Sequence, residues 1–334
     1  MDSNVKSDRP RTVLLTGAAG FVGFHVANAL MAQGHAVVGV DCITDYYQVS
    51  LKRDRLALLG ANKAFSFHEI DIADHAALKA VGEARRPDVV IHLAAQAGVR
   101  YSLENPFAYG HSNLMGHLSV MELVRHLPNK PRLVYASSSS VYGANTKAPF
   151  SETDRVDDPV SLYAATKRSC ELMSESYSRL YGMEQAGLRF FTVYGQWGRP
   201  DMAYWTFTRD IIEGRPIKVF NNGLLKRDFT WISDIVAGVV ATAMDKPAGP
   251  DPRLHRIYNI GNNRPVELGR FIEIIEEAVG KKAVKEMVPM QPGDVLATYA
   301  DVDALARDHG YAPTTPLEVG IPAFVKWYRD YTKT

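Results

Sequence analysis

The fold is decided by the stretch Thr12-Val-Leu-Leu-Thr16-Gly17-Ala-Ala-Gly20-Phe-Val-Gly23. Its first five residues form a short apolar run that predicts a buried strand, and glycines then recur at every third position. In a G-x-x-G-x-x-G turn that opens a helix, Gly17 permits the tight turn, Gly20 lets backbone N–H groups approach a pyrophosphate, and Gly23 allows close helix packing. The helix N-terminus adds a positive potential that favours the phosphates. A glycine-rich turn that binds nothing is the alternative.

The pattern of a short apolar run followed by a helical segment repeats along the chain. Short apolar runs at 36–40, 65–70, 88–93 and 132–137 alternate with helical patterns. Alternation at this spacing predicts a parallel sheet, and strands that are apolar almost throughout predict helices on both of its faces. We therefore expect an α/β fold with a doubly wound, Rossmann-type parallel sheet.

Past residue 192 the alternation of apolar runs and helical patterns ends. A loop rich in Gly, Pro and Trp follows, and then shorter elements, with helical periodicity at 231–244 and 267–280. The polar start of the chain, residues 1–10, predicts a disordered tail. The expected division is a nucleotide-binding Rossmann domain over 11–192 with returning segments near 229–260, and a smaller C-terminal α/β substrate-binding domain over 193–228 and 261–334.

Composition argues against several classes of protein. The 334 residues are 46% apolar and 22% charged, an ordinary globular balance. A net charge of +1 without a long run of like charges argues against nucleic acid and membrane surfaces as partners. Cys42 and Cys170 are too few for a disulfide framework and lack metal-ligand spacing, so we expect packed thiols and no metal site. With no signal peptide or spanning segment, a cytoplasmic protein is expected.

The ends of the expected strands form the cofactor site. Asp41 ends the second strand 18 residues after Gly23, where a carboxylate can accept hydrogen bonds from the adenosine ribose and would repel a 2′-phosphate, so NAD is favoured over NADP. A strand-end turn aspartate is the alternative. The site would also include Ala19, Phe21 and Val22 of the turn, Asp71 and Ile72 near the adenine, and the small-residue run Leu93, Ala94 and Ala95, although the last two groups could be plain strand-end packing.

Tyr163 and Lys167 are the candidate reactive residues. Four positions apart on the helix expected from about residue 160, they share one face and can reach one bound molecule. A tyrosine followed four residues later by lysine should occur about once by chance, so a surface pair is the alternative. A phenol with a pKa near 10 is a poor base at neutral pH unless a nearby cation stabilises the phenolate. Ser138, 25 residues earlier, would donate a hydrogen bond to the reacting oxygen.

With these pieces together, the sequence resembles an extended short-chain dehydrogenase/reductase, and more narrowly the UDP-glucuronate 4-epimerase family. The likeness runs from about residue 11 to 326. Gln196 stands where that family usually has proline, and Trp231 and Ser233 stand where tyrosine and aspartate are expected. The stretches that carry the likeness are Tyr101-Ser-Leu-Glu-Asn-Pro106, Tyr135-Ala-Ser-Ser-Ser-Ser-Val-Tyr-Gly143, Leu188-Arg-Phe-Phe-Thr-Val-Tyr-Gly195, Trp197-Gly-Arg-Pro-Asp-Met202 and Lys226-Arg-Asp-Phe229.

The resemblance implies a mechanism. Tyr163 takes the proton from the sugar 4′-hydroxyl while hydride passes from C4′ to tightly held NAD, and the hydride returns after the 4-keto sugar has turned over. Ser138 would hold the 4′-oxygen and Lys167 the nicotinamide ribose. The resemblance also places Asn113, Phe191 and Thr192 around the cofactor and sugar, and suggests a homodimer through helices near 105–127 and 160–181.

The choice among related reactions depends on the residues after Ser138. A 4,6-dehydratase needs an acid pair where Ser139 and Ser140 stand, and decarboxylating relatives keep a glutamate at the second position. Absence of both acids favours simple return of the hydride. A glucuronate becomes a β-keto acid on oxidation, so the site must hold its carboxylate, for which Ser139, Ser140, Thr192 and Arg199 are candidates. Arg199 could equally stack on Trp197 or pair elsewhere.

Two further residues are candidates for the nucleotide of the UDP-sugar. Arg227 would contact the diphosphate and Asp294 the ribose or uracil. The nearest alternative function is UDP-glucose/UDP-galactose 4-epimerase, or another NAD-dependent sugar-nucleotide epimerase. A catalytically dead NAD-binding module is a remote alternative, since Tyr163, Lys167 and Ser138 are all present.

Overall fold

The main β-sheet has a hydrophobic core on each of its faces, because the side chains of a strand alternate between the two faces. In this computed structural model, which describes residues 9–248, 251–289 and 297–334, β1 (Thr12–Thr16) is an interior strand of the main sheet. Val13 and Leu15 point into one core and Leu14 into the core on the opposite face, because successive side chains of a strand alternate. Most of the predicted N-terminal tail lies outside the described residues.

Seven parallel strands form this sheet, and the fold class predicted from the sequence is confirmed. All five strands expected from the apolar runs are present, with ends within a residue of the prediction. The order β10-β6-β5-β4-β1-β2-β3 places the reversal of strand order between β1 and β4, the point at which such sheets bind nucleotides. The other six strands are β2 (Ala36–Asp41), β3 (Phe65–Glu69), β4 (Val89–His92), β5 (Arg132–Ser138), β6 (Gln185–Phe190) and β10 (His255–Ile260).

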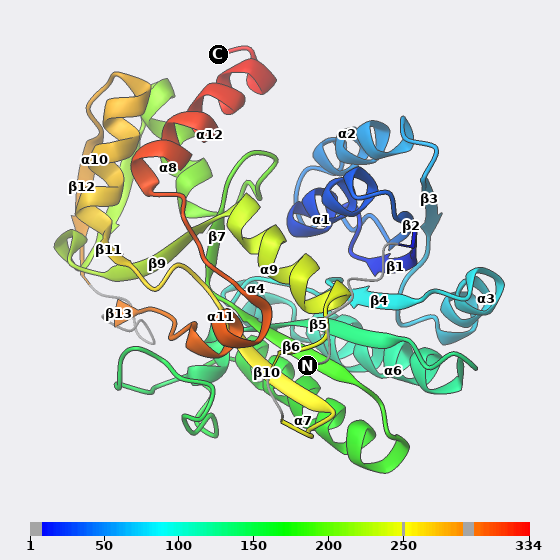
Figure 1. Ribbon diagram of the computed structural model, residues 1–334. Coiled ribbons are helices and arrows are strands. Elements are labelled where there is room, and N and C mark those ends of the chain that lie inside the picture. The colour runs from blue at the N-terminus through cyan, green and yellow to red at the C-terminus, as the bar shows by residue number, and fades with distance from the viewer. Residues whose placement is uncertain (1–8, 249–250, 290–296) are drawn as a thin grey trace.

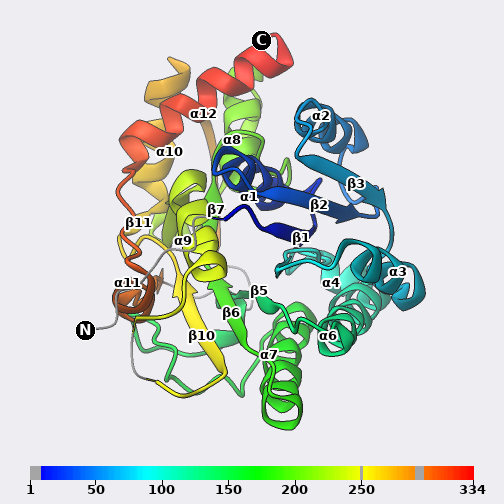
Figure 2. The same cartoon turned by 45° about the vertical axis from the view of Figure 1, so that its right-hand side comes forward.

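Helices cover both faces of the sheet (Figures 1 and 2). On one face α1 packs against α2 and α9, and α11 packs beside β10; on the other lie α3, α6 and α7. The apolar α9 comes from far along the chain, so a late segment completes the cover of β4 and β5. The bounds are α1 (Phe21–Ala32), α2 (Val49–Gly60), α3 (His75–Arg85), α6 (Gly116–His126), α7 (Leu162–Tyr181), α9 (Ile232–Met244) and α11 (Asp303–His309).

A second core lies beyond the ends of the main sheet, where α8, α10 and α12 gather (Figure 1). Aromatic side chains fill it: Phe324 contacts Tyr204, Trp205 and Trp327. The domain division expected from the sequence stays a prediction. The elements here are β7 (Thr192–Tyr194), α8 (Ala203–Glu213), β8 (Pro216–Phe220), η3 (Asn221–Gly223), β9 (Lys226–Trp231), β11 (Pro265–Glu267), α10 (Leu268–Val279), β12 (Val284–Val288), β13 (Ala297–Thr298) and α12 (Leu317–Thr332).

Short helical pieces connect the strand ends to the long helices. After β4 the chain forms α4 (Tyr101–Glu104), α5 (Pro106–Tyr109) and a π-helical turn η1 (Gly110–Met115) before α6, and after β5 it forms η2 (Ser139–Tyr142). Within the described ranges, no helix combines the length and the apolar character needed to cross a bilayer.

Candidate active site

The glycine turn between β1 and α1 is shaped by close backbone approaches. Gly17 has φ +75°, and a Cβ on it would lie 2.7 Å from the backbone nitrogen of Ala94. A Cβ on Gly23 would lie 2.0 Å from the Gly17 carbonyl oxygen. Gly20, at the N-cap of α1, has no side chain to accept from the first N–H groups of the helix. Those donors are therefore available to an anion, which fits the pyrophosphate of a dinucleotide.

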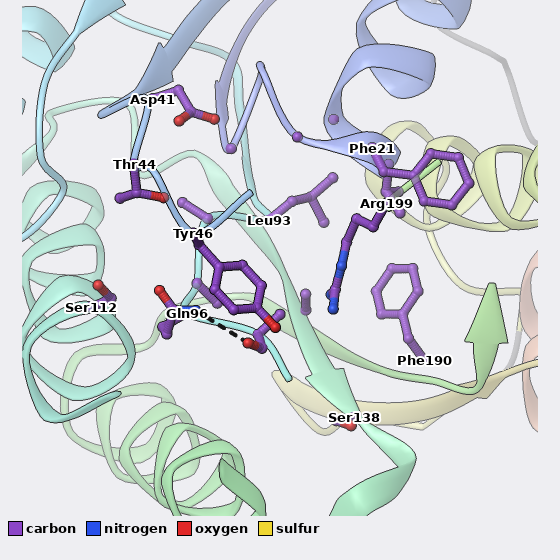
Figure 3. A pocket seen from close by; sticks show the side chains of 18 of the residues that line it. Phe21, Asp41, Thr44, Tyr46, Leu93, Gln96, Ser112, Ser138, Phe190 and Arg199 are labelled. Atoms are coloured by element: carbon purple, nitrogen blue, oxygen red, sulfur yellow. Dashed lines mark hydrogen bonds between the residues drawn. The ribbon is translucent and has the colours of Figure 1, made fainter. Parts of the chain in front are cut away.

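One cavity runs from this turn across the carboxyl ends of the sheet strands, with Asp41 and Ser138 far apart in it (Figure 3). It brings together most of the residues predicted from the sequence. Those that line it are Gly17, Gly20, Phe21, Val22, Gly23, Asp41, Asp71, Ile72, Leu93, Ala94, Ala95, Ser138, Tyr163, Lys167, Phe191 and Arg199.

At the Asp41 end, the carboxylate joins the turn to the second strand. Asp41 accepts hydrogen bonds from the backbone N–H groups of Ala19, at 3.1 Å, and Ile43, at 3.0 Å. Burial raises the pKa of Asp41 above its ordinary value, although these hydrogen bonds and the charge of Lys52 act the other way. Lys52 itself is buried and donates to the carbonyl oxygen of Thr44 at 2.6 Å and to its hydroxyl at 2.9 Å. A cation therefore lies at this end of the cavity beside the predicted ribose ligand.

At the other end, α7 presents Tyr163 and Lys167 from its first turns. Ser161 begins the helix by accepting a hydrogen bond from the N–H of Ala164, the usual way a serine caps a helix. Lys167 is 5% exposed and donates to the carbonyl oxygen of Ala136, two residues before the end of β5, at 2.9 Å. The ring of Tyr163 meets that of Tyr109 edge to face, with 6.0 Å between centroids. Phenol and ammonium thus share one cavity with Ser138.

Asn113 lies behind the cavity wall. Its amide oxygen accepts from the N–H of Gln96 at 2.8 Å, and its amide nitrogen donates to the Gln96 carbonyl and to the Thr166 hydroxyl. Asn113 is 1% exposed. In this arrangement it connects the end of β4 to α7, the helix that carries Tyr163, and it contributes no side-chain atom to the cavity surface.

Four further candidates, Ser139, Ser140, Thr192 and Arg227, are not among the residues that line this cavity. Ser138 donates to the Ser140 hydroxyl and accepts from the Ser140 N–H, each at 3.1 Å, so these two serines form one turn. Ser139 occupies the same turn, and Thr192 begins β7. Arg227 on β9 donates to the carbonyl oxygen of Lys226 at 2.9 Å. Asp294 lies outside the described residues.

Arg199 enters the cavity from the loop before α8, and in the view of Figure 3 its guanidinium has Tyr46 on one side and Phe190 on the other. Its Nε donates to Oδ1 of Asp201 at 3.0 Å and its Nη2 to Oδ2. Burial by itself would lower the pKa of Arg199, but the hydrogen bonds and charge of Asp201 raise it above the ordinary value. The Tyr46 hydroxyl donates to the same carboxylate at 3.2 Å. Of the two alternatives to carboxylate binding that the sequence left open for Arg199, stacking on Trp197 or pairing with another residue, the structure shows the second, with Asp201 as the partner.

Sequence reasoning missed several residues of the cavity. Thr44, Tyr46, Tyr47 and Lys52 follow the end of β2, Ser112 and Met202 come from the segments after β4 and β7, and Ser137 is the residue before the last in β5. All lie at or after the carboxyl ends of parallel strands, so that rule would have selected the segments. It could not have selected the side chains. Of the three departures from the family pattern, none lies on the cavity surface formed by the described residues.

A doubly wound sheet, an uncapped glycine turn at its reversal point, and a tyrosine–lysine pair in the same cavity define a nucleotide-dependent enzyme of the Rossmann class. The sequence pattern of the NAD dependent epimerase/dehydratase family matches residues 13–261. The chain belongs to this family, and its cofactor is NAD. The family resemblance noted from the sequence is confirmed.

Two relatives show how far the likeness extends. The protein CapI of Staphylococcus aureus is 50% identical over 334 residues, covering 96% of this chain and 99% of CapI. A probable UDP-glucuronate 4-epimerase of Rhizobium meliloti (strain 1021) is 47% identical over 328 residues, covering 94% of this chain and 96% of that protein.

Two solved structures share the whole fold. A UDP-glucuronic acid 4-epimerase from Bacillus cereus, in complex with UDP-glucuronic acid and NAD, matches with a TM-score of 0.88 at 32% identity, covering 96% of this chain and 99% of the other. A UDP-glucose 4-epimerase from Thermotoga maritima matches with a TM-score of 0.86 at 28% identity and the same coverage.

Proposed function

We propose that this NAD-dependent UDP-sugar 4-epimerase interconverts UDP-glucuronate and UDP-galacturonate. One observation carries the choice of a uronate: the guanidinium of Arg199 lies in the same cavity as Tyr163, Lys167 and Ser138. A cation in the cavity that contains the candidate reactive residues suits a sugar with a carboxylate at C5 better than one with a neutral hydroxymethyl group.

The proton is handled by Tyr163. Its phenolate takes the proton of the sugar 4′-hydroxyl, and Lys167, buried on the same helix face, supplies the positive charge that stabilises the phenolate. Ser138 donates its hydrogen bond to the 4′-oxygen as that oxygen becomes a carbonyl. When the reaction runs back, Tyr163 returns the same proton to the oxygen, so no proton is gained or lost.

NAD supplies the redox half of the reaction by accepting the hydride from C4′ and giving it back to the opposite face of the same carbon. Between these two events the 4-keto sugar turns about its pyrophosphate linkage, and the chain must bind both faces of the ring. Ser138, at the end of β5, and Ser139 and Ser140, in the turn that follows, are small side chains, and we propose that their size accommodates that motion.

The same serine turn favours epimerisation over the related reactions. Elimination of water across C5 and C6 needs a general acid and base beside the keto sugar, and Ser139 and Ser140 have no ionisable group near neutral pH. A β-keto acid loses CO2 when its carboxylate bond aligns with the carbonyl π system. We propose that Arg199, with hydroxyl donors from Ser139, Ser140 and Thr192, keeps the carboxylate out of that alignment.

A neutral hexose is the second candidate substrate. Asp201 already neutralises Arg199, and the fold matches that of the Thermotoga maritima UDP-glucose 4-epimerase as well. The two are separated by NMR of the products after the purified enzyme is incubated with UDP-glucuronate or UDP-glucose, each without added NAD. We expect UDP-galacturonate from the first and little product from the second. Fast conversion of UDP-glucose alone would refute the uronate assignment.

We also propose that the nucleotide half of the substrate contacts Arg227, with Asp294 at the ribose or uracil, and that NAD stays bound through purification. Release of NAD during the cycle would strand the keto sugar. The expected finding is close to one NAD released per chain on denaturation. Chains that turn over only when NAD is added would contradict it.

We also propose that the protein forms a homodimer. Apolar side chains stand exposed on the segments that the resemblance named: Phe107 on α5 is 88% exposed, and Leu172 and Leu180 on α7 are 54% and 68% exposed. Burying such a surface against a second copy would account for it. Sedimentation of Phe107→Asp tests this, since the charge should shift the protein toward monomer; wild-type protein that already sediments as a monomer would end the proposal.

A further inference from the structure

Arg55 is a charged side chain buried completely on α2. It is 0% exposed, in contrast to Arg53 two residues earlier, which lies at the surface and pairs with Glu69. Among the described residues, no Asp or Glu forms an ion pair with Arg55. Burying a cation without a partner carboxylate lowers the stability of the fold unless hydrogen bonds compensate the lost hydration. The groups that accept these hydrogen bonds therefore indicate the role of Arg55.

Its four hydrogen bonds go to two different parts of the site. Nη1 donates to the carbonyl oxygen of Ala19 in the glycine turn at 2.9 Å, and to the Tyr47 hydroxyl at 2.8 Å. Nη2 donates to the carbonyl oxygens of Trp197 at 2.6 Å and Gly198 at 2.9 Å. One planar guanidinium thus bridges the cofactor turn and the backbone immediately before Arg199.

That backbone has little freedom of its own. Trp197 adopts a left-handed φ of +57°, an unusual conformation for a bulky residue, and its ring packs against Trp327 and Tyr331. A Cβ on Gly198 would lie 1.8 Å from the Tyr204 hydroxyl, which also accepts a hydrogen bond from the N–H of Arg199 at 3.1 Å. Any shift of the Trp197 and Gly198 carbonyls would therefore be passed on to Arg199.

We infer that Arg55 is a positioning residue: it ties the Trp197–Gly198 backbone to the glycine turn and so fixes Arg199 at the place where the uronate carboxylate binds. This inference rests on the role of Arg199 in the proposed function. It makes uronate binding depend on a side chain that touches neither the sugar nor the reacting atoms.

Only a guanidinium can make this bridge. Arginine presents five N–H donors in a rigid plane, so its two terminal nitrogens reach acceptors on either side at once. A lysine ammonium is a single point with three donors and cannot span both sets of carbonyls. Since apolar residues often replace buried charges at no loss of stability, a lone arginine here indicates a requirement for geometry.

The test is a double-mutant cycle on the holoenzyme with its bound NAD, using Arg55→Lys, Arg199→Ala and the double variant. We expect Arg55→Lys to retain NAD and most of kcat, and to raise KM for UDP-glucuronate about tenfold, as loss of a charge-assisted hydrogen bond would. The double variant should be no worse than Arg199→Ala, because both changes remove the same contact. Arg53→Lys, on the exposed face of α2, is the matched control and should leave KM unchanged.

The outcomes separate this inference from the function on which it rests. If Arg199→Ala leaves KM for UDP-glucuronate unchanged, the carboxylate role of Arg199 is wrong and the inference falls with it. If Arg199→Ala raises KM but Arg55→Lys does not, or if the two effects multiply in the double variant, only the inference is wrong.

A milder variant keeps the test available if Arg55→Lys does not fold. Tyr47→Phe removes one acceptor of Arg55 and almost no volume. It should raise KM by a factor of about two to five, and only while Arg199 is present. An equal rise with and without Arg199 would overturn the inference.

Discussion

Replacing Arg199 with alanine should remove most of the activity on UDP-glucuronate while the enzyme keeps its fold and its NAD. The structure gives the reason. Asp201 occupies the Nε and Nη2 side of the guanidinium, so the Nη1 side is left to face a ligand in the cavity. Alanine takes away that donor, and it also leaves the Asp201 carboxylate unpaired beside the incoming anion.

The size of the effect follows from these two changes. A hydrogen bond to a charged group contributes about 1.5–3 kcal/mol, which is a factor of roughly 10 to 150 in kcat/KM. Repulsion by an unpaired Asp201 adds to the loss, so Arg199→Ala/Asp201→Asn should recover part of it. Recovery by the second change would show that the Asp201 charge, and not a collapsed loop, weakens the single variant.

The assay is the initial rate of UDP-galacturonate formation over a range of UDP-glucuronate concentrations, with bound NAD measured in each variant. Arg209→Ala is a suitable control, because Arg209 lies on the exposed side of α8 and pairs with its neighbour Asp210. A kcat/KM within twofold of wild type for Arg199→Ala would refute the reasoning.

Three other predictions follow from the same structure. Tyr163→Phe should lower kcat by roughly 10²- to 10⁴-fold with NAD still bound, because the proton then has no acceptor; a tenfold loss or less would mean another group takes the proton. Arg189 is 2% exposed and makes two hydrogen bonds of 2.9 Å to Glu171, so Glu171→Gln leaves its guanidinium as an uncompensated buried charge. The substitution should lower the free energy of unfolding by about 3–5 kcal/mol. Urea unfolding measures this change, and a decrease below about 1 kcal/mol would contradict the prediction. Burial lowers the pKa of His25 to about 4 in the folded protein. As the pH falls, the unfolded chain therefore binds a proton at this histidine before the folded protein does. The free energy of unfolding is unaffected by protonation of His25 above about pH 6.5 and decreases as the pH falls from there toward 4. His25→Gln should therefore lose about 2 kcal/mol less than wild type between pH 7 and 5 in urea titrations, and equal losses would exclude His25 as the sensitive group.

Much of this arrangement was predictable, because it depends on local chemistry. The apolar runs predict the strands, the period of three predicts the glycine turn, and a parallel sheet places every strand end at one edge. Gly17, Asp41, Tyr163 and Lys167 were predicted in this way, each from its place at the end of a strand or the start of a helix, and all four line the cavity. Residue types and spacing carried enough information for them.

Other features depended on contacts between distant segments. Asn113 looked like a cavity residue, but the π-helical turn η1 directs it to Gln96 and Thr166. Arg199 was expected beside a carboxylate of the substrate, and Asp201, only two residues away, pairs with it first. Tyr46 and Lys52 belong to no recognisable sequence motif. Both line the cavity because the segment after β2 lies beside it.

The sequence by itself determined the class of fold and the cofactor, and it predicted the tyrosine–lysine pair that lines the cavity, since periodicity and helix geometry act over a few residues. Only the tertiary structure decided which cations line this cavity and what holds them. Arg55 shows the physical reason: nothing in its neighbours on α2 distinguishes it from the exposed Arg53, and its role comes from carbonyl groups 36 and 142 residues away in the chain.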